Sequence, residues 1–379
     1  MKLLVPMSNH PIPRGALPRE FSVYLDFLRF GAALMVLLFH IKLLELGPSK
    51  VLSFIPNRGH DFVILFFVLS GYVIASAADR KRTQGLREFV LDRMARVYSV
   101  AMPILMICTL LALFMHAQID PERNMAHAID HPYQTLGLNL VFISESWGLQ
   151  MTPFLNGAYW SLCYEVMYYI IFGVCFFMRG WLRVAFLVVA MGLAGPKVLL
   201  LMPCWLLGMA AYIWRDRWRL HRLTAVFVAI VVPAVILILL HELGFAPAMR
   251  SIMKEWFHDS YDNLGFSNDF LVDYVAASLA AFHIYGVRYI GLRWSAGLAS
   301  FITASAAMSF TLYLFHSPMV ILVMNVFGPQ HSGFDAFLVS AVAIPLVCYG
   351  VSRVTESRRS VVRSWLARWL PGGQSRVLA

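Results

Sequence analysis

The stretch Val63-Ile64-Leu65-Phe66-Phe67-Val68-Leu69 is apolar at every position. A strand of a membrane β-barrel would instead alternate apolar and polar residues, because its two faces meet lipid and lumen. An uninterrupted apolar run that extends to about 20 residues is typical of a helix that spans a bilayer. The stretch therefore predicts membrane helices and argues against a barrel.

The composition of the whole chain agrees with this interpretation. Of its 379 residues, 59% are hydrophobic and 14% are charged, and the mean hydropathy is +0.67. A soluble domain is closer to half apolar and a quarter charged. We therefore expect an all-α fold, a polytopic integral membrane helical bundle.

Apolar windows of about 17–25 residues predict about ten transmembrane helices. A basic tail, 355–379, follows the transmembrane domain 22–354, and the tail 1–21 precedes it. That first tail lacks the apolar core of a cleavable signal peptide, so we expect the first span to act as an uncleaved anchor. The predicted spans are 22–44, 61–79, 98–117, 158–178, 182–196, 198–214, 223–241, 270–288, 297–326 and 335–354.

The distribution of positive charge predicts the orientation of the bundle. With ten spans, 23 of the 31 Lys and Arg residues fall on the side of the N-terminus and seven on the other side. Because positive loops stay inside, both termini are expected in the cytoplasm. The basic side predicts contact with anionic membrane lipids. Nucleic acid is not an expected partner, since the chain has no soluble basic domain.

Arg29 and His40 lie eleven positions apart in the first predicted span. Eleven steps of a helix return to within about 20° of the start and advance about 16 Å, so both side chains share one face. Asp26 is placed to pair with Arg29 at i,i+3. A structural pair and an interfacial histidine would explain these residues. Ionisable groups aligned within a membrane helix nevertheless favour a functional site.

Two further motifs lie at the entry to the third span and in the middle of the second. Arg93 and Arg96 are one helical turn apart, so they can face one groove and bind phosphate. A positive-inside anchor is the simpler explanation of that pair. Ser70 and Gly71 lie within the second span. They can line a pore or serve small-residue packing.

Two motifs are expected near the outer surface. Trp160 suits the interfacial aromatic belt, and Glu165 lies about one turn deeper, where a carboxylate needs a partner. A surface acid would be the alternative. Tyr313 and His316 precede Pro318, which frees a backbone carbonyl and kinks the helix. A plain kink explains this stretch about as well as a site does.

No metal site is predicted. His127, Asp130 and His131 share the long loop 118–157, but no spacing typical of metal ligands supports a site. We expect a solvated loop that shapes access for a substrate.

Five of these stretches, taken in order, resemble the motifs of the bacterial membrane acyltransferase-3 family of sugar O-acyltransferases. The residues concerned are Arg29 with His40, the 66–71 run, Arg93 with Arg96, Trp160-Ser161-Leu162 with Glu165, and 309–318. The sequence departs from the family pattern at Phe310 and at the reduced C-terminal Glu356-Ser357-Arg358 motif. The sequence of the fourth motif is similar to that of family members that modify exopolysaccharides.

The resemblance implies transfer of an acyl group, expected to be acetyl. The donor would be cytoplasmic acyl-CoA (acetyl-CoA), and the acceptor an extracytoplasmic glycan or lipid-linked saccharide at the bacterial inner (plasma) membrane. His40 would act as general base or acyl carrier, with Glu165 orienting it. Arg29, Arg93, Arg96 and Ser70 would bind the donor, and Asp26, Trp160, Tyr313 and His316 would support the site.

A transporter or flippase for a lipid-linked sugar or an anion is the alternative from another class. It would also place polar residues on the faces of spans. Transport should proceed without acyl-CoA, whereas acyl transfer consumes it.

Overall fold

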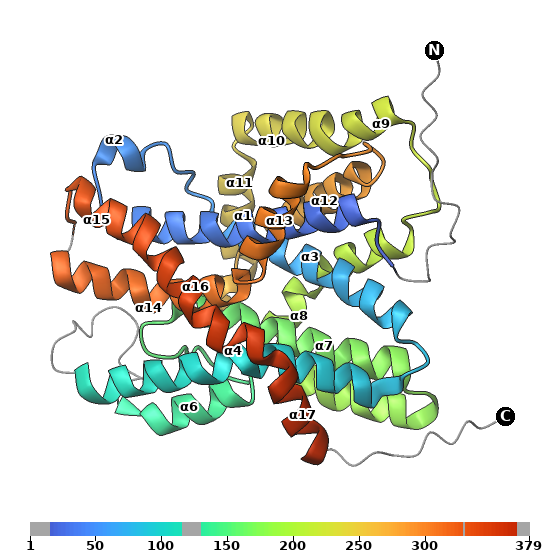
Figure 1. Cartoon of the computed structure of the whole chain (residues 1–379), viewed down its shortest axis with the longest axis horizontal. Helices are drawn as coiled ribbons and strands as arrows, with labels where there is room; N and C mark the ends of the chain where they lie inside the picture. Colours follow the sequence, from blue (N-terminus) through green and yellow to red (C-terminus); the bar gives the residue numbers. More distant parts are fainter. Residues whose placement is uncertain (1–15, 116–129, 329, 370–379) are drawn as a thin grey trace.

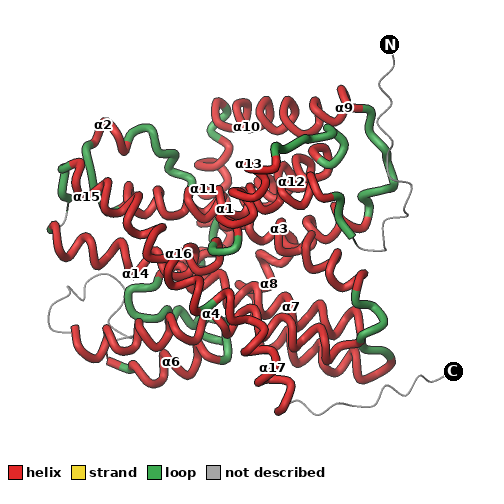
Figure 2. The backbone as a smooth tube through the Cα atoms, viewed as in Figure 1, coloured by secondary structure: helices red, strands yellow, loops and turns green. Residues whose placement is uncertain are grey.

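The structure, a computed structural model, describes residues 16–115, 130–328 and 330–369. All regular secondary structure in these residues is helical, and the backbone tube in Figure 2 shows helices and loops throughout. The predicted all-α fold is confirmed for this part of the chain.

The helices run in chain order, and Figure 1 labels most of them. Short 3₁₀ and π segments (η) connect or interrupt the longer helices. Their bounds are α1 Arg19–Leu43, α2 Ser49–Leu52, α3 Gly59–Arg80, α4 Gly85–Met115, α6 Pro132–Leu140, η1 Gly157–Tyr159, α7 Trp160–Phe177, α8 Gly180–Ile213, α9 Arg222–Val226, η2 Phe227–Val231, α10 Val232–Glu242, α11 Phe245–Phe257, η3 His258–Ser260, η4 Asp262–Ser267, α12 Phe270–Val287, α13 Ala296–Ala306, α14 Ser309–Phe327, α15 Phe334–Leu338, η5 Val339–Ala343, α16 Ile344–Val354, η6 Glu356–Arg358 and α17 Arg359–Trp369.

Nine helical segments in the described residues are long and apolar enough to cross a membrane. The fifth of them, α8, is two helices joined at Gly195, whose φ of 76° and ψ of 171° are not helical. Only glycine adopts such a conformation without steric cost. Counting the two halves of α8 separately gives ten spans, the number that the sequence predicted.

The predicted ninth span, 297–326, is wrong as a single helix. The structure breaks it into α13 and α14. The Ser309 hydroxyl donates to the carbonyl oxygen of Ala306 at 2.8 Å, and a Glu356 carboxylate oxygen accepts from the backbone N–H of Thr311 at 3.3 Å. Glu356 thus satisfies a free donor at the start of α14. Because Glu356 comes from a distant part of the chain, no local sequence pattern predicted the break.

Four α-helices in the described residues, α2, α6, α11 and α17, form where the sequence predicted none. The expected solvated loop 118–157 is wrong in its described part, because α6 lies there, packs on α4 and buries Thr135 and Asn139. α11 lies in the connection between α10 and α12. α17 lies in the predicted tail and packs against α4, as Figure 1 shows near the C-terminus. The C-terminal segment is therefore part of the folded bundle up to Trp369.

Close packing of α3 on α8 sets the centre of the bundle. A Cβ atom added at Gly71 would lie 2.0 Å from the carbonyl oxygen of Trp205, and one at Gly208 would lie 1.9 Å from that of Val68. Small residues of this kind let membrane helices approach closely. Gly71 therefore has a packing role, and its neighbour Ser70 is fixed in position beside it.

A buried ion pair holds the loop before α7 against the bend in α8. The Lys197 ammonium lies 2.7 Å from a Glu145 carboxylate oxygen, and each side chain is 1% exposed. Lys197 also donates to the carbonyl oxygen of Leu149. We call this arrangement the Glu145–Lys197 clasp. It fixes the loop from which α7 starts.

Candidate functional site

One pocket collects side chains from α1, α3, α4, α7 and α14, which are far apart in the sequence. Three of its lining residues are arginines, and we call it the arginine pocket. It is lined by Arg29, Val63, Phe66, Phe67, Leu69, Ser70, Val73, Ile74, Arg93, Arg96, Val97, Ser161, Leu162, Glu165, Tyr169, Ser309, Phe310 and Tyr313.

The three arginines differ in their partners. Arg29 pairs with Asp26 at 3.2 Å, as the i,i+3 spacing predicted. Among the described residues, neither Arg93 nor Arg96 forms an ion pair, and Nε of Arg93 is buried without a hydrogen-bond partner. A buried donor without a partner is costly. The pocket is therefore suited to an anion that would satisfy both arginines.

Glu165, from α7, supplies a carboxylate to the lining of this pocket. It accepts a hydrogen bond from Tyr169, one turn further along α7. The Tyr169 hydroxyl also lies 3.3 Å from that of Ser70, to which the indole N–H of Trp205 donates at 3.2 Å. Ser70 thus belongs to the pocket wall. His40 is absent from that wall, so the structure does not bring Glu165 to it.

A pair of histidines lies further along α1 and α14. Nε2 of His316 is 3.3 Å from Nδ1 of His40, with ring centroids 4.7 Å apart. Nδ1 of His40 also lies 2.8 Å from the carbonyl oxygen of Val36, and Nδ1 of His316 lies 2.6 Å from that of Tyr313. His316 is fully buried, whereas His40 is half-buried. The partner of His40 is therefore His316.

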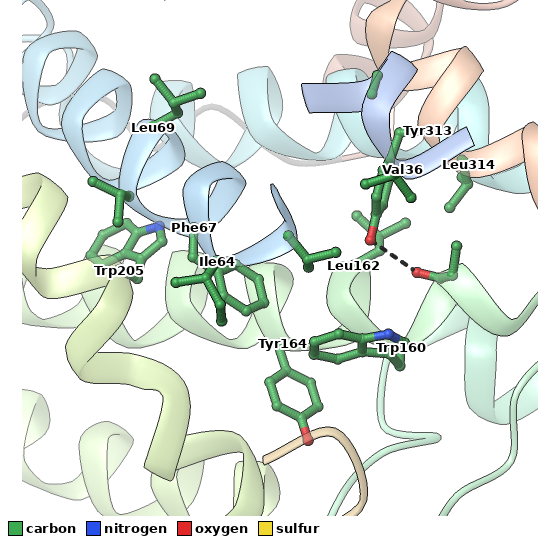
Figure 3. Close-up of a cluster of buried hydrophobic side chains, with 14 of the residues drawn as sticks. Val36, Ile64, Phe67, Leu69, Trp160, Leu162, Tyr164, Trp205, Tyr313 and Leu314 are labelled. Atoms are coloured by element: carbon green, nitrogen blue, oxygen red, sulfur yellow. Dashed lines mark hydrogen bonds between the residues drawn. The ribbon is translucent and has the colours of Figure 1, made fainter. Parts of the chain in front are cut away.

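Hydrogen bonds to the residues around η1 hold α14 in place. Pro318 has no N–H to donate, so the carbonyl oxygen of Leu314 is free and accepts from the Asn156 side chain at 2.9 Å. The Tyr313 and Ser161 hydroxyls are 2.5 Å apart, the contact dashed in Figure 3. The carbonyl freed by proline therefore binds a loop side chain, whereas the sequence had suggested a role near His316.

Trp160 lies outside the arginine pocket, in the aromatic cluster of Figure 3. Its ring stacks on Phe266 with centroids 4.3 Å apart and on His60 with centroids 5.7 Å apart. His60 in turn pairs with the buried Asp273 at 3.1 Å. Trp160 therefore joins the starts of α3, α7 and α12 rather than touching the arginines.

The predicted residues thus fall into two groups joined by Tyr313, which lines the pocket one turn before His316. The sequence analysis missed Tyr169 and the pair of His60 with Asp273, and it gave Ser161 no role of its own within the fourth motif. Tyr169 follows Glu165 by four positions, a spacing that could have identified it. The other three depend on contacts between distant helices. His127 lies outside the described residues, and Asp130 and His131 precede α6.

Comparison with known proteins identifies the family. Residues 22–353 match the acyltransferase domain that defines the acyltransferase-3 family. An O-acetyl transferase of Shigella phage Sf6 is 30% identical over 154 residues, which cover 39% of this chain and 44% of that relative. The chain thus matches less than half of the relative's length. No solved structure matches. Because the matched domain covers most of the chain, this protein belongs to the acyltransferase-3 family.

Proposed function

We propose that this protein is a membrane-bound O-acyltransferase that transfers an acyl group, acetyl in the first instance, from cytoplasmic acyl-CoA. The acceptor is a hydroxyl of a glycan or lipid-linked saccharide on the outer side of the bacterial inner membrane. Family membership and the name of the phage relative support this reaction class. The observation that carries the proposal is the placement of the arginine pocket and the His40–His316 pair along the same two helices, α1 and α14.

The arginine pocket suits the donor. Acyl-CoA carries phosphate groups, and guanidinium forks bind phosphate by paired, charge-assisted hydrogen bonds. Arg93 and Arg96 have no carboxylate partner among the described residues. The excess of Lys and Arg on this side supports a cytoplasmic orientation. We infer that the nucleotide end of acyl-CoA binds here while its thioester arm extends toward His40, roughly 16 Å along α1.

The hydrogen bonds of the two histidines define which nitrogen is available for chemistry. Nδ1 of His40 carries the proton, because it contacts the carbonyl oxygen of Val36. Nε2 of neutral His40 therefore holds a lone pair. In His316, Nδ1 donates to the carbonyl of Tyr313, which leaves its Nε2 as an acceptor facing His40. His316 then stabilises His40 when that ring gains a second proton.

Two routes use this lone pair. In direct transfer, Nε2 of His40 takes the proton of the acceptor hydroxyl while the oxygen attacks the thioester carbonyl. The C–S bond breaks, and the CoA thiolate receives the proton. In the covalent route, Nε2 attacks the thioester carbonyl, the C–S bond breaks and CoA leaves as the thiolate. The acceptor oxygen then attacks the acyl-imidazole, the C–N bond breaks, and the hydroxyl proton passes to the thiolate. Glu165, expected to orient His40, instead balances the charge of the arginine pocket in this proposal.

The test uses purified protein in liposomes with acetyl-CoA labelled on the acetyl group and crude envelope glycans as acceptor. Loss of thioester and transfer of label are followed for the wild type and for His40→Ala. The variant should lose about 10²–10⁴-fold in turnover while remaining folded. His241→Ala, an exposed histidine on α10, is the matched control.

The outcomes separate the candidate functions. Turnover by the wild type that His40→Ala abolishes supports acyl transfer, and label retained on the protein without acceptor supports the covalent route. Near-normal turnover by His40→Ala would refute the proposed chemistry. Absence of acetyl-CoA binding and turnover by the wild type would favour the transporter or flippase.

A further inference from the structure

The C-terminal helix α17, Arg359–Trp369, lies outside the part of the chain that matches the family domain, which ends at residue 353. It packs along α4, close to the start of that helix, and Figure 1 shows the two crossing. The side chains of Trp365 and Trp369 are exposed. This helix therefore follows the matched residues and lies beside the helix that carries Arg93 and Arg96.

An ion-pair network fixes the position of α17. Nε of Arg363 lies 2.7 Å from a carboxylate oxygen of Asp92, and another nitrogen of the same guanidinium pairs with Glu88. Lys81, from the end of α3, shares Asp92. The guanidinium of Arg87 also donates to the carbonyl oxygen of Ala367 at 3.2 Å. Several contacts thus hold α17 directly against the turn of α4 that leads into Arg93.

Arg359 lies on the same face of α17 as Arg363, one turn earlier. It is half-buried. Arg359 comes three residues after Glu356, which contacts Thr311 next to the pocket-lining Phe310. It comes four residues before Arg363, which pairs with Asp92 next to the pocket-lining Arg93. The fold therefore holds Arg359 between two segments that contact neighbours of the pocket lining.

The carboxylates nearest to Arg359 already have other partners. Asp92 pairs with Lys81 and Arg363. Glu356 accepts from the backbone N–H and the hydroxyl of Thr311. Among the described residues, Arg359 itself forms no ion pair. Guanidiniums held together without matching carboxylates are stabilised when an anion binds between them.

We propose that α17 places Arg359 beside the arginine pocket as a further binding residue for the phosphate groups of acyl-CoA. The inference rests on the proposed function and extends it. Coenzyme A carries a diphosphate and a separate phosphate on its ribose, so it offers more anionic groups than one pair of arginines can bind. Arg359 thereby selects donors that carry the nucleotide over shorter thioesters.

The test compares two donors, acetyl-CoA and S-acetyl-pantetheine, which has the thioester arm but no phosphate. In Arg359→Gln, the KM or Kd for acetyl-CoA should rise about 10-fold or more, as expected for loss of a charge-assisted hydrogen bond. The value for S-acetyl-pantetheine should stay at that of the wild type. Arg368→Gln is the matched control, because this exposed arginine of the same helix forms no ion pair among the described residues.

A second pair of variants distinguishes a loss of phosphate binding from a general structural defect. Arg359→Lys keeps the charge but loses the fork and should bind acetyl-CoA with intermediate affinity. Arg363→Gln, which releases α17 from Asp92 and Glu88, should reproduce the selective loss of acetyl-CoA affinity. Equal losses for both donors would show a general structural defect and overturn the proposal.

The failures of the two proposals can be told apart. If the wild type binds acetyl-CoA and Arg359→Gln binds it equally well, the role of Arg359 is refuted and the proposed function stands. If the wild type binds no acetyl-CoA, both proposals are refuted together.

Discussion

The Glu145–Lys197 clasp and the arginine pocket both place charges inside the helical bundle, but they differ in the balance of those charges. In the clasp, one ammonium meets one carboxylate at 2.7 Å, and both are almost completely buried. In the pocket, Arg93 and Arg96 have no ion-pair partner among the described residues. Balanced buried charges hold two segments together, whereas unbalanced ones indicate a place for a ligand.

The largest expected effect comes from breaking the clasp. Lys197→Met leaves Glu145 buried without its cation, and one of the two carboxylate oxygens already lacks a partner. Removing one member of a buried ion pair costs about 3–5 kcal/mol. We therefore expect a marked fall in the thermal unfolding temperature of the purified protein in detergent.

The matched control replaces both members of the clasp, Glu145→Leu with Lys197→Met. Because no uncompensated charge remains, the double variant should recover most of the stability of the wild type. If Lys197→Met alone unfolds at the temperature of the wild type, the clasp has no structural role and the comparison fails.

An intermediate effect, on binding rather than on stability, is expected for Arg96→Ala. The variant should lose about 1.5–3 kcal/mol of acyl-CoA affinity, or roughly 10–100-fold, because a hydrogen bond to a charged group is lost. Its unfolding temperature should stay the same or rise, since a repulsive charge is removed. Equilibrium binding of acetyl-CoA and thermal unfolding measure the two quantities.

Arg219→Ala is the control for this prediction, because Arg219 is exposed and forms no ion pair among the described residues. Loss of stability in Arg96→Ala with unchanged affinity would place Arg96 in the same structural class as the clasp. That result would remove the distinction between the two regions.

The smallest effect is expected at the neutral contact between Tyr313 and Ser161, in the wall of the pocket. Tyr313→Phe removes one hydroxyl and should lower the free energy of unfolding by about 0.5–1.5 kcal/mol. A double-mutant cycle with Ser161→Ala measures the coupling between the two residues. Additive losses would mean that the two hydroxyls do not interact, and that this contact does not couple α7 to α14.

The sequence predicted much of the architecture because membrane helices need long apolar runs. The α3 prediction, 61–79, differs from the observed Gly59–Arg80 by two residues or fewer at each end. The break at Gly195 in α8 lies next to the predicted boundary between the spans 182–196 and 198–214. The break between α13 and α14 was missed because Glu356, far along the chain, stabilises the start of α14.

The candidate site was predicted in part. Periodicity placed Arg29 and His40 on one face, and Ser70, Glu165 and Tyr313 do line the pocket with Arg29. The sequence does not predict which residue contacts His40, because that contact depends on how α14 packs on α1. A spacing rule works within one helix and gives no register between two helices.

The amino-acid sequence by itself determined the helical membrane fold, most of the spans and the motif residues, because hydrophobicity and helical period are local properties. Only the tertiary structure decided that His316 contacts His40, that Glu165 lines the pocket with the arginines, and that α17 packs on α4. Those outcomes depend on helix packing, in which side chains from distant segments compete for the same space and the same partners.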